Sequence, residues 1–199
     1  MVDAALALAL IIVYWGIVVA NVLTIKRETA KAPQISPTIK EEKPLQLGWR
    51  VIVLGFVTQP LVIFLVRDPW ILFQPLEAFD QTAFSIFGAF LALAGIIGTR
   101  QCYVAMGRHW NMWIDPLQES PLIDRGPYRW VRHPIYAFQM LVSVGIWCLI
   151  PTLFLLGIVL LNAVCIWIKS SGEERFLVRS HGDAYRGYLS RTGRFFPKF

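Results

Sequence analysis

Charged residues are scarce in this chain of 199 residues. Asp, Glu, Lys and Arg make up 16% of it and hydrophobic residues 56%, whereas about a quarter of a soluble domain is charged. This composition excludes an ordinary soluble domain and indicates an integral membrane protein. The formal net charge of +6 lies outside the apolar runs, which predicts membrane lipids as partners and no nucleic acid.

Cysteine and histidine are also scarce, with three residues of each kind. Cys102, Cys148 and Cys165 show no paired spacing of the metal or redox type, so we expect thiols that pack as small hydrophobic groups. His109 and His181 lie far apart without ligand spacing. The sequence therefore predicts no metal site.

Five apolar runs cover residues 4–25, 51–66, 82–98, 135–150 and 152–168. At about 1.5 Å per residue the first run can cross a hydrocarbon core of about 30 Å, and the acidic Asp3 before it argues against a cleaved signal peptide. Only Pro151 separates the last two runs, which predicts a tight helical hairpin. The predicted fold is all-α: a polytopic membrane protein with about five transmembrane helices, a C-terminal helical hairpin and a cytoplasmic tail.

Basic residues mark one side of the membrane. The stretches 26–50, 99–134 and 169–199 hold six, five and seven Lys and Arg residues, whereas the stretch 67–80 holds one and the N-terminal end none. The positive-inside bias then places the N-terminus outside and the C-terminus in the cytoplasm. We expect a multi-pass protein of a prokaryotic plasma membrane, because the chain is compact and shows no eukaryotic retrieval signal.

Polar and aromatic residues interrupt the apolar pattern in the segment 126–136, Gly-Pro-Tyr-Arg-Trp-Val-Arg-His-Pro-Ile-Tyr. Pro134 suits the first turn of a helix, with His133 before it, and the free backbone N–H groups of that turn could receive an anionic or hydroxyl group. The alternative is structural: Arg129, Arg132 and His133 would anchor the helix at lipid headgroups beside an aromatic belt.

A second polar segment follows the predicted hairpin. Lys169, Glu173 and Leu177 recur at i, i+4 and i+8 and share one helix face, whereas Glu174 points elsewhere. Such a Lys before Glu pair is worth only about 0.2 to 0.5 kcal/mol in an isolated helix, so a cation and carboxylate facing a pocket is the better explanation. Gly182 then predicts an interruption of this helix, and Asp183 can cap a new one, so that the tail folds back as a lid.

The ordered motifs Arg132-His-Pro-Ile-Tyr136, Glu173-Glu-Arg-Phe-Leu177, Gly182-Asp-Ala-Tyr185 and Thr192-Gly-Arg-Phe-Phe-Pro197 resemble the isoprenylcysteine carboxyl methyltransferase family of integral membrane methyltransferases. The resemblance covers roughly the last hundred residues. We therefore treat residues 99–199 as a catalytic core and residues 1–98 as N-terminal transmembrane helices with a cytoplasmic connector. Related cores occur in phospholipid methyltransferases and, more distantly, in membrane sterol reductases that bind NADPH.

The resemblance implies S-adenosyl-L-methionine as cofactor and methyl donor, held by the loop, the start of the hairpin and the tail. The cofactor-binding residues that it implies are Ser120, Pro121, Leu122, Ile123, Tyr128, His133, Pro134, Ile135, Tyr136 and Glu173. Lys169 and Glu173 are the implied catalytic residues. Lys169 stands where the family has a substrate-holding arginine, so the charge remains while the bidentate fork is absent. Ser120 also replaces a histidine of family members.

The expected reaction is direct displacement of the methyl group from the sulfonium to a lipophilic acceptor that arrives from the bilayer. An isoprenylcysteine-type carboxylate is the first expectation and needs no base, whereas an amine or thiol would need Glu174 or Tyr136 to take a proton. A membrane reductase is the alternative enzyme, with its NADPH phosphates on the basic residues Arg186, Arg191, Arg194 and Lys198. A scaffold or small transporter is the third class, and no apolar run carries the central charge typical of a transporter.

Overall fold

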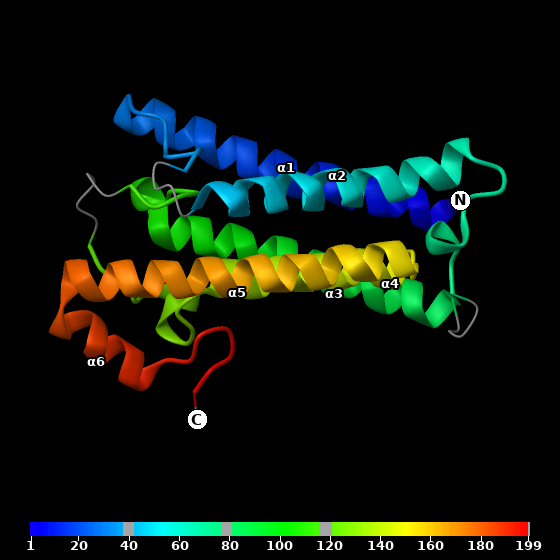
Figure 1. Ribbon diagram of the computed structural model, residues 1–199. Coiled ribbons are helices and arrows are strands. Elements are labelled where there is room, and N and C mark those ends of the chain that lie inside the picture. The colour runs from blue at the N-terminus through cyan, green and yellow to red at the C-terminus, as the bar shows by residue number, and fades with distance from the viewer. Residues whose placement is uncertain (38–41, 77–80, 116–120, 199) are drawn as a thin grey trace.

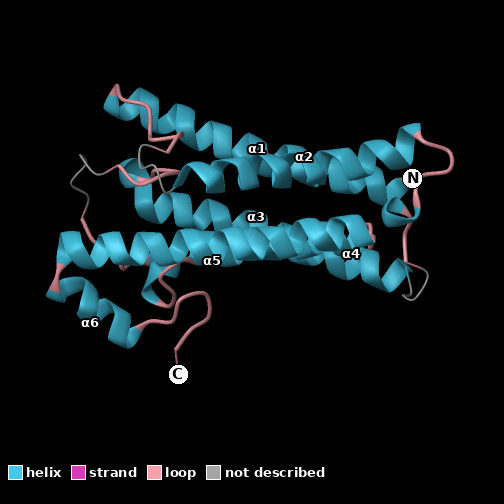
Figure 2. Ribbon diagram, viewed as in Figure 1, coloured by secondary structure: helices cyan, strands magenta, loops and turns pink. Residues whose placement is uncertain are grey.

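The computed structural model describes residues 1–37, 42–76, 81–115 and 121–198. They form six α-helices joined by loops and short 3₁₀ turns (Figures 1 and 2). The helices are α1 (Val2–Thr29), α2 (Lys43–Leu65), α3 (Gln81–Met106), α4 (Pro134–Leu149), α5 (Leu153–His181) and α6 (Asp183–Arg191). The 3₁₀ turns are η2 (Ile71–Phe73), η3 (Gly107–His109) and η4 (Gly126–Arg129).

The membrane prediction is confirmed by the length and composition of the helices. Helices α1, α2 and α5, and α3 together with η3, are long and apolar enough to span a bilayer, while α4 is a shorter apolar helix of 16 residues. The described residues contain no strand, only two isolated β-bridges. The all-α polytopic prediction therefore holds, including the C-terminal hairpin of α4 and α5.

Local sequence signals set the ends of the hairpin helices. Pro134 is the first residue of α4 and His133 is its N-cap. The Thr152 hydroxyl caps α5 by accepting a hydrogen bond from the backbone N–H of Leu155 at 3.1 Å. Gly182, at φ 54°, ends α5 and begins α6, as predicted, because glycine adopts positive φ without steric cost.

Glycines bring α3 and α4 unusually close together. A Cβ added at Gly88 would lie 2.6 Å from the carbonyl oxygen of Gly145, and one at Gly95 would lie 2.6 Å from that of Phe138. Small residues of this kind let helix backbones approach in a membrane, where van der Waals packing drives association. This packing fixes the start of α4, and with it His133, against α3.

One end of the bundle gathers the polar segments. The C-terminal end of α1, the start of α2, the ends of α3 and α5 and the whole of α6 lie there, opposite the N-terminus and the tip of the hairpin (Figure 1). The stretches rich in Lys and Arg therefore meet at this end. That it faces the cytoplasm stays a prediction from the positive-inside bias.

Candidate active site

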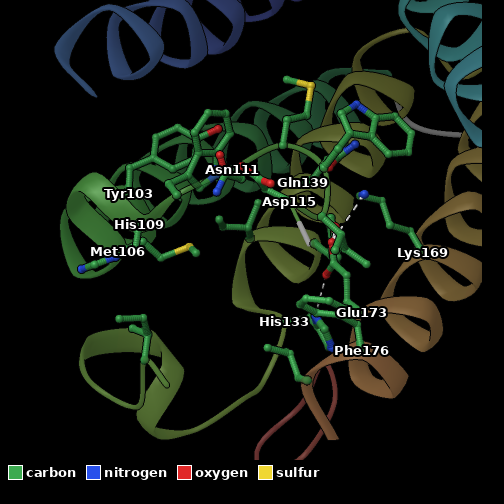
Figure 3. A pocket seen from close by; sticks show the side chains of 18 of the residues that line it. Tyr103, Met106, His109, Asn111, Asp115, His133, Gln139, Lys169, Glu173 and Phe176 are labelled. Atoms are coloured by element: carbon green, nitrogen blue, oxygen red, sulfur yellow. Dashed lines mark hydrogen bonds and ion pairs between the residues drawn. The ribbon is translucent and has the colours of Figure 1, made fainter. Parts of the chain in front are cut away.

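A cavity of about 1030 Å³ opens at this end of the bundle, walled by parts of all six helices and by the loops after α3 (Figure 3). Of the residues predicted for the site, those that line it are Pro121, Leu122, Ile123, Tyr128, His133, Ile135, Tyr136, Lys169 and Glu173. Pro134 is buried as the first residue of α4 and is absent from this lining. Ser120 lies outside the described residues.

Glu173 is the centre of the polar wall. Its Oε1 accepts a hydrogen bond from the Tyr136 hydroxyl at 2.7 Å, and its Oε2 lies 3.5 Å from Nδ1 of His133. Nζ of Lys169 lies 3.5 Å from Oε1. Figure 3 shows Lys169 and His133 approaching Glu173 from different sides. Three partners from two helices therefore fix the carboxylate at the cavity wall.

Glu174 faces away from this cavity wall and holds the C-terminal tail. It accepts a hydrogen bond from Nε of Arg132 at 2.8 Å and a bidentate pair from Arg194. Two backbone hydrogen bonds also hold the tail: the N–H of Arg132 donates to the carbonyl of Gly193 at 2.9 Å, and the N–H of His133 donates to the carbonyl of Arg194 at 3.0 Å. The tail therefore pins both residues that precede α4.

Lys169 is buried and makes contacts on three sides. Its Nζ lies 3.4 Å from Oε1 of Glu42, 3.5 Å from Oε1 of Glu173 and 3.9 Å from the ring centroid of Trp113. From the sequence, Trp113 can be interpreted either as part of a loop over the cofactor or as a tryptophan at the membrane boundary. Glu42 is not among the predicted site residues. Glu42 belongs to an irregular connector 127 positions away from Lys169, and no local pattern marks such a pairing.

The connector between α1 and α2 also shapes the loop that carries Trp113. The carbonyl of Gln34 accepts from the N–H groups of Met112 and Trp113 at 3.0 and 3.1 Å, and its N–H donates to Oδ1 of Asn111 at 2.7 Å. Lys31 forms an ion pair with Asp115 at 3.3 Å. Residues 30–36 therefore hold the loop against the mouth of the cavity.

Helix α6 covers another side of the cavity, in the place predicted for a lid. Tyr185 and Tyr188 are both buried, and the Tyr188 hydroxyl donates to the carbonyl of Tyr128 at 2.6 Å. The Tyr185 hydroxyl is buried without a hydrogen-bond partner and lines the cavity. A buried polar atom left in this state is suited to a ligand that supplies its partner.

The basic tail residues considered for NADPH phosphates are all engaged within the chain. Arg186 pairs with Asp183, Arg191 with Asp124, Arg194 with Glu174, and Lys198 with the carbonyl oxygen of Ser190. The pairs of Arg186 and Arg191 are exposed, and each uses only part of the N–H donors of its guanidinium group. These contacts therefore do not decide between a methyltransferase and a reductase.

The charge of His133 should make stability depend on pH. Burial lowers the pKa of His133, but hydrogen bonds and charges from Glu173 and Glu174 outweigh it and raise the pKa above its ordinary value. The stabilising contribution is therefore complete below about pH 6.5 and is lost as the pH rises through the raised pKa. We expect the Tm in detergent to fall from about pH 6 to pH 9 more steeply for the native protein than for His133→Gln. Equal slopes for the two proteins would contradict this assignment.

Comparison with known proteins bears on this arrangement directly. Residues 88–179, which include α4, most of α5 and the His133 and Glu173 pair, match the model of the isoprenylcysteine carboxyl methyltransferase (ICMT) family. The match covers slightly less than half of the chain. It supports the resemblance read from the sequence, and the matched family is one of methyltransferases.

The curated proteins that the chain resembles carry other names. The nickel-cobalt-cadmium resistance protein NccN of Alcaligenes xylosoxydans xylosoxydans is 27% identical over 111 residues, which cover 55% of this chain and 51% of that protein. The cobalt-zinc-cadmium resistance protein CzcN of Cupriavidus metallidurans is 28% identical over 112 residues, 54% of this chain and 50% of that protein. The uncharacterized protein YpbQ of Bacillus subtilis is 30% identical over 78 residues, which cover 37% of this chain and 44% of that protein. The chain thus spans about half the length of the curated relatives it matches.

The names of two of these relatives refer to metal resistance, which raises the question of groups of metal-ligating side chains in this chain. Within the described parts of the chain, no group of three or more His, Cys, Asp or Glu side chains is placed to hold a metal ion. All three cysteines are buried and unpaired with one another, and they lie on α3, α4 and α5.

Proposed function

We propose that this protein is a membrane methyltransferase that moves a methyl group from S-adenosyl-L-methionine to a lipophilic acceptor. The observation that carries the proposal is one cavity with a polar and an apolar end. His133, Tyr136 and Glu173 line the polar end, and α1 and α2 add the apolar residues Trp15 and Val53. Its volume of about 1030 Å³ is at the upper limit for a small-molecule site and leaves room for a donor and an acceptor.

The polar end fits an adenosine cofactor that carries a sulfonium. Glu173 presents acceptor oxygens for hydroxyl and amino groups, and the unpartnered Tyr185 hydroxyl offers a further hydrogen bond. Tyr128, Leu122 and Ile123 add aromatic and apolar surface. When bound there, S-adenosyl-L-methionine supplies an activated methyl group, and these residues hold and orient it.

The apolar end fits an acceptor that arrives from the bilayer. Trp15 and Val18 on α1 and Trp49, Val53 and Leu54 on α2 line this part of the cavity. Leu54 is 65% exposed on a helix long and apolar enough to span the membrane, so the lining continues onto the lipid-facing surface. A lipophilic chain could therefore reach the cavity without crossing water.

The chain's own contribution to the reaction is position and exclusion of water. Direct displacement needs the nucleophile, the methyl carbon and the sulfur in line. Holding donor and acceptor in one cavity in this arrangement supplies most of the rate acceleration. Helix α6 and the loop with Trp113 cover the site and keep water from a reactive sulfonium. An acceptor carboxylate would react as it is, whereas an amine must first lose a proton.

Calorimetric titration of the purified protein tests this proposal. We expect S-adenosylhomocysteine to bind and NADPH to produce no heat of binding, because the matched family is one of methyltransferases. Incubation with isotope-labelled S-adenosyl-L-methionine and lipid extract should place the label in the lipid fraction. Binding of NADPH alone would favour a reductase, and silence from both ligands would contradict an enzyme of either kind.

A further inference from the structure

Lys169 has little capacity left to hold an anionic substrate. Its ammonium carries three N–H donors, and its three close neighbours are Oε1 of Glu42, Oε1 of Glu173 and the face of Trp113. The side chain is only 3% exposed. A substrate carboxylate could bind this cation only by displacing one of these groups.

The side chain of Glu42 pairs with Lys169 rather than capping a helix. Glu42 is the N-cap residue of α2, yet its side chain makes no capping hydrogen bond and reaches Lys169 instead. The residue is 8% exposed, and its Oε2 is buried without a hydrogen-bond partner. A buried carboxylate costs free energy unless it is paired, so we infer that the charge of Glu42 serves to neutralise Lys169.

The neighbours of Lys169 leave no free positive charge for an anion. Glu42 and Glu173 face its ammonium, and Glu173 also faces His133, whose raised pKa favours the charged form, so two carboxylates match two cations. The aromatic residues Tyr103, Trp110 and Trp113 line or border the same space. Aromatic faces attract cations through their quadrupole and give nothing comparable to anions.

We propose that the methyl acceptor is an amine carried on a lipophilic chain rather than a carboxylate, and that Glu42 is the residue that sets this specificity. The inference rests on the proposed methyltransferase function and names its substrate class. An ammonium group would lie against Glu173 and the aromatic wall, while its apolar chain extends between α1 and α2.

The corresponding reaction is balanced without another reagent. The acceptor ammonium gives a proton to water at the mouth of the cavity and becomes a neutral amine. The nitrogen lone pair then forms the N–C bond as the S–C bond breaks, and the sulfur keeps the electron pair as a neutral thioether. The product is a methylated ammonium, and Glu173 stays a carboxylate throughout.

Competition between acceptors tests the inference. Purified protein with labelled S-adenosyl-L-methionine would be given dodecylamine, phosphatidylethanolamine in nanodiscs, or an S-prenylated N-acetylcysteine, which is a carboxylate. We expect methyl transfer to at least one amine to exceed transfer to the carboxylate by at least about tenfold. The two amine arms separate a free lipophilic amine from a phospholipid headgroup.

Glu42→Gln then tests the residue itself. This variant removes the charge and keeps the shape, so the ratio of amine to carboxylate transfer should fall at least about tenfold while S-adenosylhomocysteine still binds. Glu28→Gln, the same change at an exposed position of α1, is the matched control and should keep the native ratio. A native preference for the carboxylate, an unchanged ratio in Glu42→Gln, or no transfer to either amine despite binding of S-adenosylhomocysteine would overturn the inference. Failure of S-adenosylhomocysteine to bind the native protein would instead overturn the proposed function.

Discussion

Glu173→Ala is expected to lower kcat/KM for methyl transfer by at least about 100-fold while the protein still inserts in the membrane. The carboxylate contacts Tyr136, His133 and Lys169, and in the proposed complex it also contacts the donor. Hydrogen bonds to charged groups contribute about 1.5 to 3 kcal/mol each, and about 1.4 kcal/mol is a factor of ten. Loss of two such contacts is therefore enough for the expected decrease.

The measurement is steady-state transfer of labelled methyl, with calorimetry of S-adenosylhomocysteine on the same preparations. Glu173→Gln keeps the shape and one acceptor oxygen, so it should retain part of the affinity but lose the charge. Glu28→Gln removes the same charge at an exposed position and should behave like the native protein. Native turnover in Glu173→Ala would remove Glu173 from the site.

Glu174→Ala is expected to destabilise the folded protein by about 3 to 5 kcal/mol, the cost of breaking a buried ion pair by removing one partner. The carboxylate neutralises Arg132 and Arg194, whose side chains are 11% and 25% exposed, and its own side chain is 11% exposed. Without Glu174 two guanidinium groups lose their counter-ion in a largely buried place. The tail that they hold then loses its anchor beside His133.

Thermal unfolding in detergent measures this effect. Asp124→Ala is the matched control, because its pair with Arg191 is exposed on both sides and such pairs contribute about 0 to 1 kcal/mol. In a double-mutant cycle, Arg194→Met should cost less in the Glu174→Ala background than alone, since the two residues share one interaction. Equal losses of Tm for Glu174→Ala and Asp124→Ala would show that the ion pairs of Glu174 with Arg132 and Arg194 do not stabilise the fold.

Local sequence signals predicted much of the fold. The apolar runs located the membrane helices among the described residues, and Pro134 and Gly182 marked helix ends that the structure has at the same positions. The N-cap of α6 is Gly182, and Asp183, predicted as the cap, is the first residue of that helix. These features depend on residues close in the sequence, where backbone preferences and periodicity are readable. Helix α2 starts at Lys43 rather than at Val51, because its first turns carry polar residues that an apolar run does not include.

The site could be predicted only in part. The helix face shared by Lys169 and Glu173 follows from their spacing, and the resemblance linked Glu173 to His133, which the structure places 3.5 Å apart. Glu42, and the contact of Trp113 with Lys169, could not be found in this way. Both reach Lys169 through the packing of a connector and a loop, and tertiary contacts of this kind leave no periodic pattern in the sequence.

A structure of the protein with S-adenosylhomocysteine bound would show directly whether His133 and Glu173 belong to one binding site. We predict that one bound molecule contacts both His133 and Glu173 inside the cavity, with its sulfur directed toward the space beside Lys169. A molecule bound elsewhere, or one that touches only one of these two residues, would contradict it.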